Sequence, residues 1–352
     1  MNVEHMEIES CVFDSDGTYS RCCSVERDAL ENKLRNIYSS QWCEITSSGI
    51  NAIFSTLYTI FENTPSAHLF YVSDEIFEFT KLLINKLSKT FQKTVVYFNV
   101  DNPSNLKNSI DILKRDICCI YLESCSNPTN KSLDLNTLSY ISNFSFPVVV
   151  DNTWLSPVKF NPLDYGADVS IDSCTKYLSG GKCIAGCVNF KNYDDLSKNV
   201  AANISLFGTH VSKDFCLTIL HRLESLSNRV NNATARTEQF YNFLMTLKTV
   251  DTIYYNKTMK PCVIQIGILI DETLKYLFNE YTPEDIYDAI EKIVTSHKIL
   301  FETSFGKNYD SIDSYPKYYN GKLFLRVAIG YESNETFHHN IKNLINNLHG
   351  KL

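Results

Sequence analysis

Val148-Val149-Val150-Asp151-Asn152 is an apolar stretch that ends in a carboxylate, and its composition predicts a buried β-strand. Further short β-branched runs lie on both sides of it, at 68–73, 94–100, 117–124, 167–173 and 185–190. Segments with helical spacing, such as 77–88 and 133–143, separate several of these runs. The alternation predicts an α/β layer with a mostly parallel sheet, in which ligands bind at the carboxyl ends of the strands.

The regions on either side of this layer are predicted to differ: a helix precedes it, and a long helix and a smaller α+β domain follow it. Upstream, an amphipathic helix is expected just after Ser47-Ser48-Gly49, because apolar residues recur at helical spacing in Ile50, Ile53, Leu57, Ile60 and Phe61. The loop before it is suited to face an anion. Downstream, the segment 213–247 contains no Pro or Gly and predicts one long helix that joins two domains. The remainder, 248–352, is typical of a smaller α+β domain.

Composition excludes several classes of protein. With 44% hydrophobic and 21% charged residues, the 352-residue chain is typical of a globular protein of more than one domain. The net charge of -7 is spread along the chain, and no basic stripe indicates nucleic-acid binding. The acidic N-terminus does not have the form of a secretory signal, and no apolar run approaches the length of a membrane span, so we expect a cytoplasmic protein. The 12 cysteines lack paired C-x-x-C spacing, so no metal is expected.

A second strand end carries the groups from which chemistry is predicted. Ser173-Cys174-Thr175-Lys176 offers two hydroxyls and an amine, which together can bind a phosphate and position a nucleophile. Each feature alone is weak evidence for a site. A surface Ser-x-Thr-Lys is usually solvated, and Asp151 at the end of the first strand is as readily explained by a helix cap or a turn.

The order and spacing of several motifs resemble the Cys/Met-metabolism (trans-sulfuration) family of pyridoxal 5'-phosphate (PLP) enzymes, such as the cystathionine γ-synthases and γ-lyases. The resemblance covers nearly the whole chain. Its central motifs are Tyr121-Leu-Glu-Ser-Cys-Ser-Asn-Pro-Thr129, Val150-Asp-Asn-Thr-Trp154, Asn161-Pro-Leu-Asp-Tyr-Gly-Ala-Asp168 and Asp172-Ser-Cys-Thr-Lys-Tyr-Leu178. The outer ones are Tyr19-Ser-Arg21, Arg27-Asp-Ala-Leu-Glu31, Ser47-Ser-Gly-Ile50 and Phe324-Leu-Arg-Val-Ala-Ile-Gly330.

The resemblance implies a fold and a domain organisation. The expected fold is the fold-type I, aspartate-aminotransferase-like PLP enzyme, with a large α/β domain and a smaller α+β C-terminal domain. The expected divisions are an N-terminal arm at 1–40 that contacts a neighbouring subunit, a PLP-binding domain at 41–212, a linking helix at 213–247 and a C-terminal domain at 248–352.

The resemblance also implies how the chain holds PLP. Lys176 corresponds to the Schiff-base lysine, a role that suits an amine kept nucleophilic by burial. Asp151 corresponds to the carboxylate that keeps the pyridine nitrogen protonated. Ser173 and Thr175 match the phosphate-binding hydroxyls, and the helix N-terminus at Gly49 and Ile50 favours an anion. The implied cofactor-binding set is Tyr19, Arg21, Ser48, Gly49, Ile50, Phe77, Asn127, Asp151, Thr153, Ser173, Thr175 and Lys176.

The substrate and oligomer follow from the same comparison. Arg326 matches the arginine that binds a substrate α-carboxylate, with Asn127, Ser304 and Thr303 as further substrate-binding residues. Tyr19 and Arg21 match a pair that reaches the phosphate of the neighbouring subunit. We therefore expect a homodimer as the smallest active unit, with a homotetramer as an alternative, acting on an amino acid without a nucleic-acid or membrane partner.

The chain departs from the family where substrate is expected. Phe77-Glu78-Phe79-Thr80 stands where members carry Tyr-Gly-Gly-Thr, so Phe77 keeps a stacking ring but lacks the hydroxyl that can move protons. The segment Gly180-Gly-Lys-Cys183 replaces Gly-His-Ser-Asp, and Thr303 replaces a glutamate that some members have.

These departures keep three hypotheses open. The first is elimination or replacement at the β or γ carbon of a sulfur-containing or O-activated amino acid, with Lys176, Asp151 and Phe77 as the catalytic set. The second is a divergent PLP enzyme that acts on another amino acid in a biosynthetic pathway. The third is a catalytically degenerate protein that binds PLP without turnover.

Overall fold

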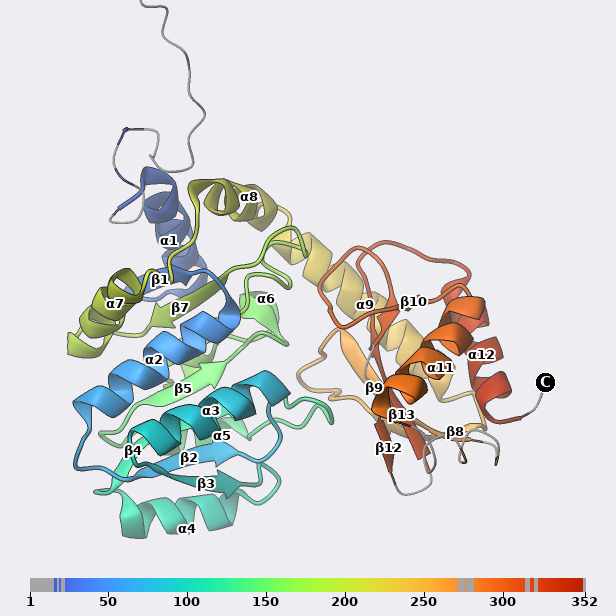
Figure 1. Cartoon of the computed structure of the whole chain (residues 1–352), viewed down its shortest axis with the longest axis horizontal. Coiled ribbons are helices and arrows are strands. Elements are labelled where there is room, and N and C mark those ends of the chain that lie inside the picture. The colour runs from blue at the N-terminus through green and yellow to red at the C-terminus, as the bar shows by residue number, and fades with distance from the viewer. Residues whose placement is uncertain are drawn as a thin grey trace, which may run out of the picture.

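The computed structural model describes residues 16, 17, 19, 23–270, 272, 276, 282–313, 317–319 and 322–350, which form two lobes (Figure 1). The larger lobe is built on a seven-stranded sheet in which the strands from β6 to β3 pair in parallel and β7 is antiparallel to both neighbours. The order is β1 (Trp42–Thr46), β7 (Gly186–Phe190), β6 (Val169–Asp172), β5 (Val148–Asp151), β4 (Ile117–Glu123), β2 (Leu69–Ser73) and β3 (Thr94–Phe98). The predicted α/β layer is confirmed.

Helices cover both faces of this sheet, as the side chains of β5 show. Val149 packs into one apolar cluster, whereas Val148 and Val150 pack into another, because successive residues of a strand point to opposite faces. The first cluster includes α2 (Gly49–Asn63), α3 (Glu78–Thr90) and α7 (Asp195–Phe207). The second includes α1 (Val25–Tyr38), α4 (Pro103–Leu113), α5 (Leu135–Ile141) and α8 (Lys213–Leu223). Between β5 and β6 lie α6 (Ser156–Lys159) and a 3₁₀ helix (Pro162–Tyr165).

The smaller lobe has a second sheet with helices on one face. Its strands are β10 (Leu300–Phe301), β11 (Ser311–Ile312), β13 (Lys322–Ala328), β9 (Val263–Leu269) and β8 (Val250–Tyr254), and β12 (Lys317–Tyr319) pairs with β13. The apolar cluster on that face contains residues of α9 (Leu226–Leu244), α11 (Pro283–Ser296) and α12 (Phe337–Leu348). Leu325 and Val327 belong to the cluster, so Arg326 between them faces the other way, and it contacts Asn127 of the larger lobe.

Two features differ from the sequence prediction. The single helix expected over 213–247 is divided at Glu224 and Ser225 into α8 and α9. The carbonyl oxygen of Arg222 accepts hydrogen bonds from the Arg229 guanidinium (2.9 Å) and the Ser225 hydroxyl (3.3 Å), and such side-chain donors compete with the helical ladder. Strand β1 was not predicted, because the polar Glu44 and Thr46 interrupt the continuous apolar run by which the other strands of the sheet were predicted.

The N-terminal helix packs on the larger lobe. Residues of α1 share an apolar cluster with α8, and they contact β1. The expected contact of the arm 1–40 with another subunit stays a prediction. Among the helices in the described part of the chain, none is both long enough and apolar enough to span a membrane.

Candidate active site

A cavity of about 280 Å³ lies where the carboxyl ends of β4, β5 and β6 meet the N-terminus of α2 and a turn of the smaller lobe. This is the place at which parallel sheets bind ligands. Most of the predicted site residues line it. They are Ser48, Gly49, Ile50, Phe77, Asn127, Asp151, Thr153, Ser173, Thr175, Lys176, Thr303 and Arg326.

The N-terminus of α2 and the loop after β6 form one end of the cavity. Gly49 lies so close to Ser173 that a β-carbon on it would stand 2.8 Å from the Ser173 Cβ atom. The amides of Gly49 and Ile50 belong to the first helical turn, where the helix supplies no acceptor. The Thr175 hydroxyl is held by the backbone of Ala185 (3.2 and 3.3 Å). This end of the cavity therefore brings the first amides of α2 beside the Ser173 side chain, which suits an anion, and the Thr175 hydroxyl would join them by turning its proton away from Ala185.

Asp151 ends β5 in the middle of the cavity wall. Its carboxylate accepts hydrogen bonds from the Thr153 amide (3.0 Å) and the Tyr121 hydroxyl (3.3 Å). Burial nevertheless raises the pKa of the Asp151 carboxyl above its usual value. A carboxylate in such a place is stabilised by a cation that faces it, which a protonated pyridine nitrogen would provide.

Lys176 projects into the cavity between the two lobes. Its ammonium donates to the Ser304 hydroxyl (3.2 Å) and lies 5.1 Å from the centre of the Phe305 ring. Burial, together with the positive charges of Arg326 and Lys307, lowers the pKa of Lys176 to about 8. The amine is therefore more readily neutral, and hence nucleophilic, than an ordinary lysine.

Arg326 lies at the junction of the cavity with a second compartment. Its guanidinium pairs with Asp313 (2.8 Å) and donates to the Asn127 side chain (3.4 Å). Thr303 in turn donates to the same Asp313 carboxylate (3.2 Å). Asn127 and Thr303 are thus brought beside Arg326 as predicted, whereas Ser304 contacts Lys176 instead.

Sequence reasoning gave no role to Glu123, Phe305 or Asp313. Glu123 is buried at the end of β4 and accepts a hydrogen bond from the Phe77 amide (2.6 Å), and burial raises its pKa well above the usual value. A charged residue that ends a fully apolar strand is a signal that the sequence did contain. Phe305 and Asp313 gave no such signal, because their contacts are made with residues far away in the chain.

The roles predicted for Tyr19 and Arg21 are not tested by the cavity. Tyr19 is 48% exposed and is not among the residues that line it. Arg21 lies outside the described residues. Because both were expected to act on a neighbouring subunit, a single chain does not test their roles.

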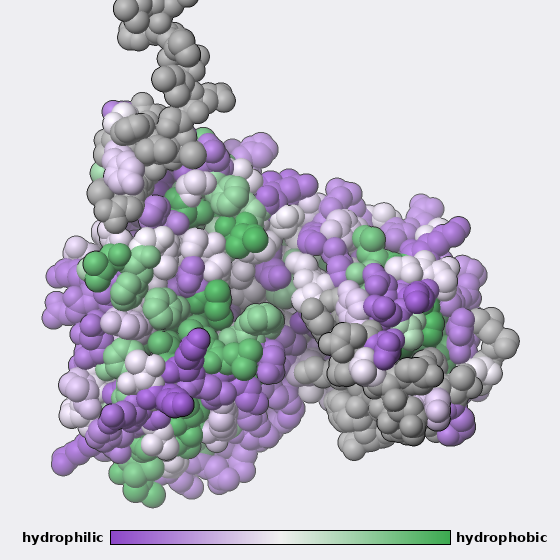
Figure 2. Space-filling model, viewed as in Figure 1, coloured by the Kyte–Doolittle hydropathy of each residue, from purple (hydrophilic) through white to green (hydrophobic). Residues whose placement is uncertain are grey.

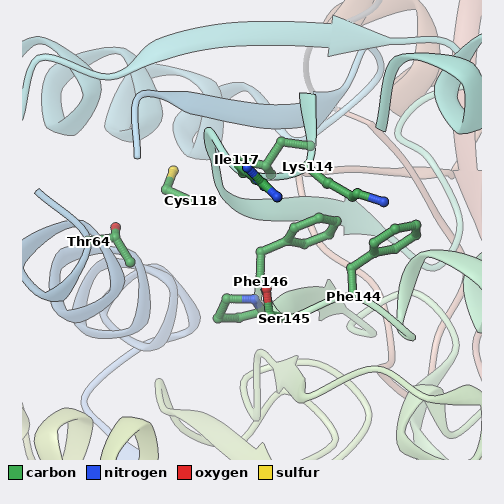
Figure 3. Close-up of a pocket in the computed structure, with 9 residues that line it drawn as sticks. Thr64, Lys114, Ile117, Cys118, Phe144, Ser145 and Phe146 are labelled. Atoms are coloured by element: carbon green, nitrogen blue, oxygen red, sulfur yellow. The ribbon is translucent and has the colours of Figure 1, made fainter. Parts of the chain in front are cut away.

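A larger cavity, of about 520 Å³, lies at the amino ends of the parallel strands, and Figure 3 shows the residues that line it. It is lined by the start of β4 and by Lys114, Arg115, Phe144 and Phe146. None of the predicted site residues reaches it, and it lies at the amino ends of the strands. We therefore do not assign the chemistry to it.

A family model of Cys/Met metabolism PLP-dependent enzymes matches residues 6–261. The chain belongs to this family. Curated relatives include a cystathionine β-lyase of Staphylococcus haemolyticus (27% identical; 77% of this chain and 68% of that protein), a cystathionine β-lyase of Neurospora crassa (30%; 65% and 50%) and an L-methionine γ-lyase of Fusobacterium nucleatum subsp. polymorphum (28%; 67% and 59%). The alignments thus span half to about two thirds of the relatives' own length.

Solved structures share the fold over most of the chain. A cystathionine γ-synthase of Xanthomonas oryzae pv. oryzae in complex with cystathionine matches with a TM-score of 0.80 at 20% identity, covering 95% of this chain and 88% of that one. A methionine γ-lyase of Micromonospora echinospora matches with a TM-score of 0.75 at 19% identity, covering 93% and 88%. The predicted fold and family are confirmed, and with them PLP as the cofactor of this PLP-dependent family.

The residues present fit PLP. Gly49 permits the close approach that the phosphate end needs, and Asp151 is a partly buried carboxylate without a cation in contact with it in the described structure. Lys176 is an amine with a lowered pKa in the same cavity. The amides of Gly49 and Ile50 and the hydroxyls of Ser173 and Thr175, together called the phosphate cup, suit the cofactor's phosphate. Asp151 suits its ring nitrogen, and Lys176 suits its aldehyde.

Substitution of Gly49 by alanine is expected to weaken PLP binding. The added methyl would overlap Ser173 and push the first turn of α2 away from the phosphate end. Overpacking of this kind costs roughly 1–3 kcal/mol, or about a fivefold to 150-fold loss of affinity. Equilibrium dialysis of PLP checks this, with Gly208→Ala as a control for strain alone: alanine is strained at the left-handed Gly208 (φ 66°), but its β-carbon meets no atom within 4 Å and lies outside the cavity lining. Unchanged affinity in Gly49→Ala would show that the phosphate binds elsewhere.

The lowered Lys176 pKa predicts a pH dependence in the protein freed of PLP. Acylation of Lys176 should rise with pH with a midpoint near 8, since only the neutral amine attacks. Between about pH 8 and the ordinary lysine value of about 10.4, the unfolded chain binds a proton that the folded chain does not. The free energy of unfolding should therefore rise with pH across that window. Peptide mapping by mass spectrometry measures the midpoint, and an ordinary lysine value would contradict the geometry.

Proposed function

We propose that this enzyme catalyses elimination or replacement at the β or γ carbon of an amino acid that bears sulfur or an activated oxygen. One observation carries the proposal: Lys176, Asp151 and the phosphate cup line the same cavity between the two lobes. The names of the relatives, cystathionine β-lyase and methionine γ-lyase, support this class of reaction. We further propose that the enzyme acts in the cytoplasm.

The chain's own groups divide the work. Bound PLP supplies an electron sink for the substrate's Cα carbon. Lys176 would hold the cofactor, and its neutral amine is placed to remove the Cα proton of the substrate. Asp151 keeps the proton on the cofactor's ring nitrogen, while Ser173, Thr175 and the amides of Gly49 and Ile50 hold the phosphate.

Substrate is positioned from the smaller lobe. Arg326 binds the α-carboxylate through its planar guanidinium, and Asn127 orients the same group from the larger lobe. Ser304 keeps the Lys176 amine near the reacting carbon, since its hydroxyl already accepts from that amine. The cavity is lined by residues of both lobes, and this enclosure limits the water around the proton transfers.

An amino-acid panel tests the proposal. Purified holoenzyme is mixed with cystathionine, methionine, cysteine and O-acylated homoserines, and the release of ketoacid, ammonia and thiol is followed. We expect release from at least one of them. Changes in cofactor absorbance without release from any would contradict the proposal. They would favour the divergent enzyme or the degenerate PLP-binding protein.

The divergent enzyme has one specific observation in its favour. Phe77 lies at the cavity and is 39% exposed, and its ring can stack on the cofactor, yet it carries no hydroxyl. If an ordinary family reaction is limited by that loss, Phe77→Tyr should raise elimination activity by part of the roughly 10²–10⁴-fold that general acid assistance supplies. Initial rates on the panel measure this, with cofactor content as the control. A uniformly unchanged rate would assign Phe77 to a hydrophobic lid.

We also propose that the active unit is at least a homodimer. Figure 2 shows apolar residues gathered on one face of the larger lobe, and near the cavity Ile184 is 62% and Phe79 is 64% exposed. Exposed apolar side chains beside a site are typical of surfaces that a second subunit covers. This arrangement suits Tyr19 and Arg21 reaching a neighbouring phosphate. Sedimentation velocity of the holoenzyme tests the oligomer, and a monomer would overturn this part of the proposal.

A further inference from the structure

A second compartment of about 490 Å³ opens from the cofactor cavity on the far side of Arg326. The two cavities share Phe77, Asn127, Thr303 and Arg326 as lining residues. A substrate whose α-carboxylate is bound at Arg326 therefore has room for a side chain that extends away from the cofactor. The chemistry of this compartment decides which side chains fit.

The floor of the compartment is the face of the small sheet that the helices leave uncovered. Arg326 on β13 is paired directly with Gln265 on β9, so their side chains stand next to each other on the same face. Phe324, two residues before Arg326, lies on that face as well. The floor thus offers one guanidinium, one amide and one aromatic ring.

Gln265 presents an acceptor without a donor. The residue is only 2% exposed, and its side-chain carbonyl oxygen has no hydrogen-bond donor among the described residues. Buried polar atoms are almost always paired, and one left unpaired costs free energy until a partner arrives. Because Gln265 lines the compartment, the missing donor is most simply a group of the ligand.

Asp313 changes the charge of the compartment. Its carboxylate pairs with Arg326 at 2.8 Å, and only 14% of its side chain and 9% of that of Arg326 are exposed. With a substrate α-carboxylate bound at Arg326 as proposed, one guanidinium faces two carboxylates, so no positive charge is left to attract a third carboxylate at the far end of the side chain and the surroundings are negative. Glu78 adds a second carboxylate to the lining, and the described lining residues include no basic residue other than Arg326.

We propose that Asp313 and Gln265 make this compartment selective for amino acids that carry a second amino group at the far end of the side chain. An ammonium donates to the Gln265 oxygen and is attracted by Asp313 and Glu78, whereas a carboxylate there meets two like charges and an acceptor. The inference deepens the proposed function, since it names a substrate class for the same site. It concerns binding, and so it does not depend on which bond is cleaved.

Three sulfur amino acids of similar length test the selection. They are S-(2-aminoethyl)-L-cysteine, S-propyl-L-cysteine and S-(2-carboxyethyl)-L-cysteine, which share the α-amino acid and the thioether and differ at the far end. Affinity for the holoenzyme is measured from the change in cofactor absorbance on titration. We expect the amine to bind roughly tenfold or more tighter than the propyl compound, and the carboxylate to bind weakest, in line with charge interactions at a partly buried site.

Two variants assign the selection to residues. Asp313→Asn should reduce the ratio of the affinity for the aminoethyl compound to the affinity for the carboxyethyl compound. It should do so mainly by raising the affinity for the carboxyethyl compound, because Arg326 loses its internal partner. Gln265→Leu should lower the affinity for the aminoethyl compound and leave the affinity for the propyl compound unchanged or higher. Leucine has a similar shape and needs no hydrogen-bond partner, so the sheet should remain folded. Asp251→Asn is the matched control. It also removes a carboxylate that pairs with a cation of β13, Lys322, but Asp251 is not among the residues of the compartment.

The outcomes separate the two proposals. The inference would be overturned if the aminoethyl compound bound no tighter than the propyl compound. It would also be overturned if the ratio of aminoethyl to carboxyethyl affinity were the same in Asp313→Asn as in Asp251→Asn. Selection for the amine, lost in Asp313→Asn or Gln265→Leu, supports the inference even if none of the panel amino acids is cleaved. In that case only the proposed reaction fails. Cleavage of panel amino acids without any selection leaves the reaction standing and refutes the substrate class.

Discussion

Replacement of Lys176 by alanine is expected to abolish both turnover and the covalent attachment of PLP. No other amine of the described chain lines the cavity beside the phosphate cup and Asp151. The visible absorbance that lysine-bound PLP gives should disappear, and the release of ketoacid should fall to the rate without enzyme. Borohydride reduction followed by peptide mapping of the wild-type protein should place the cofactor on Lys176.

The matched control is Lys182→Ala. Lys182 lies in the same loop, but it is exposed and is not a lining residue of the cavity. It should keep both the absorbance and the activity. Retention of attached cofactor by Lys176→Ala, or its loss from Lys182→Ala alone, would refute the assignment.

Asp151→Asn should lower turnover by roughly 10²–10³-fold, the scale expected when a buried electrostatic partner is removed. The amide keeps the size and can still accept from Thr153, but it cannot hold a proton on the cofactor's ring nitrogen. PLP should still bind, because the phosphate cup is untouched. Steady-state rates on a panel substrate, normalised to cofactor content, measure the loss.

The stability of the Asp151→Asn protein without PLP provides a second readout. Burial raises the Asp151 pKa, which means that the charged carboxylate is unfavourable there when no cation faces it. The neutral amide should leave the melting temperature of the PLP-free protein equal or higher, while the additional stabilisation by PLP becomes smaller. Wild-type turnover, or a large loss of stability without PLP, would show that Asp151 has a structural role instead.

The strands of the large sheet were predictable because each leaves a local pattern in the sequence. A strand buried on both faces is a continuous apolar run, and the run at 148–150 reflects both covered faces of β5. Asp151 and Lys176 follow such runs, and this position alone predicts that both lie at one edge of the sheet. The break between α8 and α9 left no such pattern. It is accompanied by hydrogen bonds from the Arg229 and Ser225 side chains, and in the sequence these two residues look like ordinary polar residues on a helix surface.

The sequence by itself determined the α/β class from its local apolar pattern, and the family and cofactor from motifs whose order and spacing resemble those of known PLP enzymes. Only the tertiary structure decided which groups the active residues meet. Ser304 and Phe305 reach Lys176 from the other lobe, and Asp313 meets Arg326 within the smaller lobe. Local periodicity specifies the face on which a side chain lies, but not which distant residue faces it. The charge balance at Arg326, and with it the proposed choice of substrate, depends on that long-range pairing.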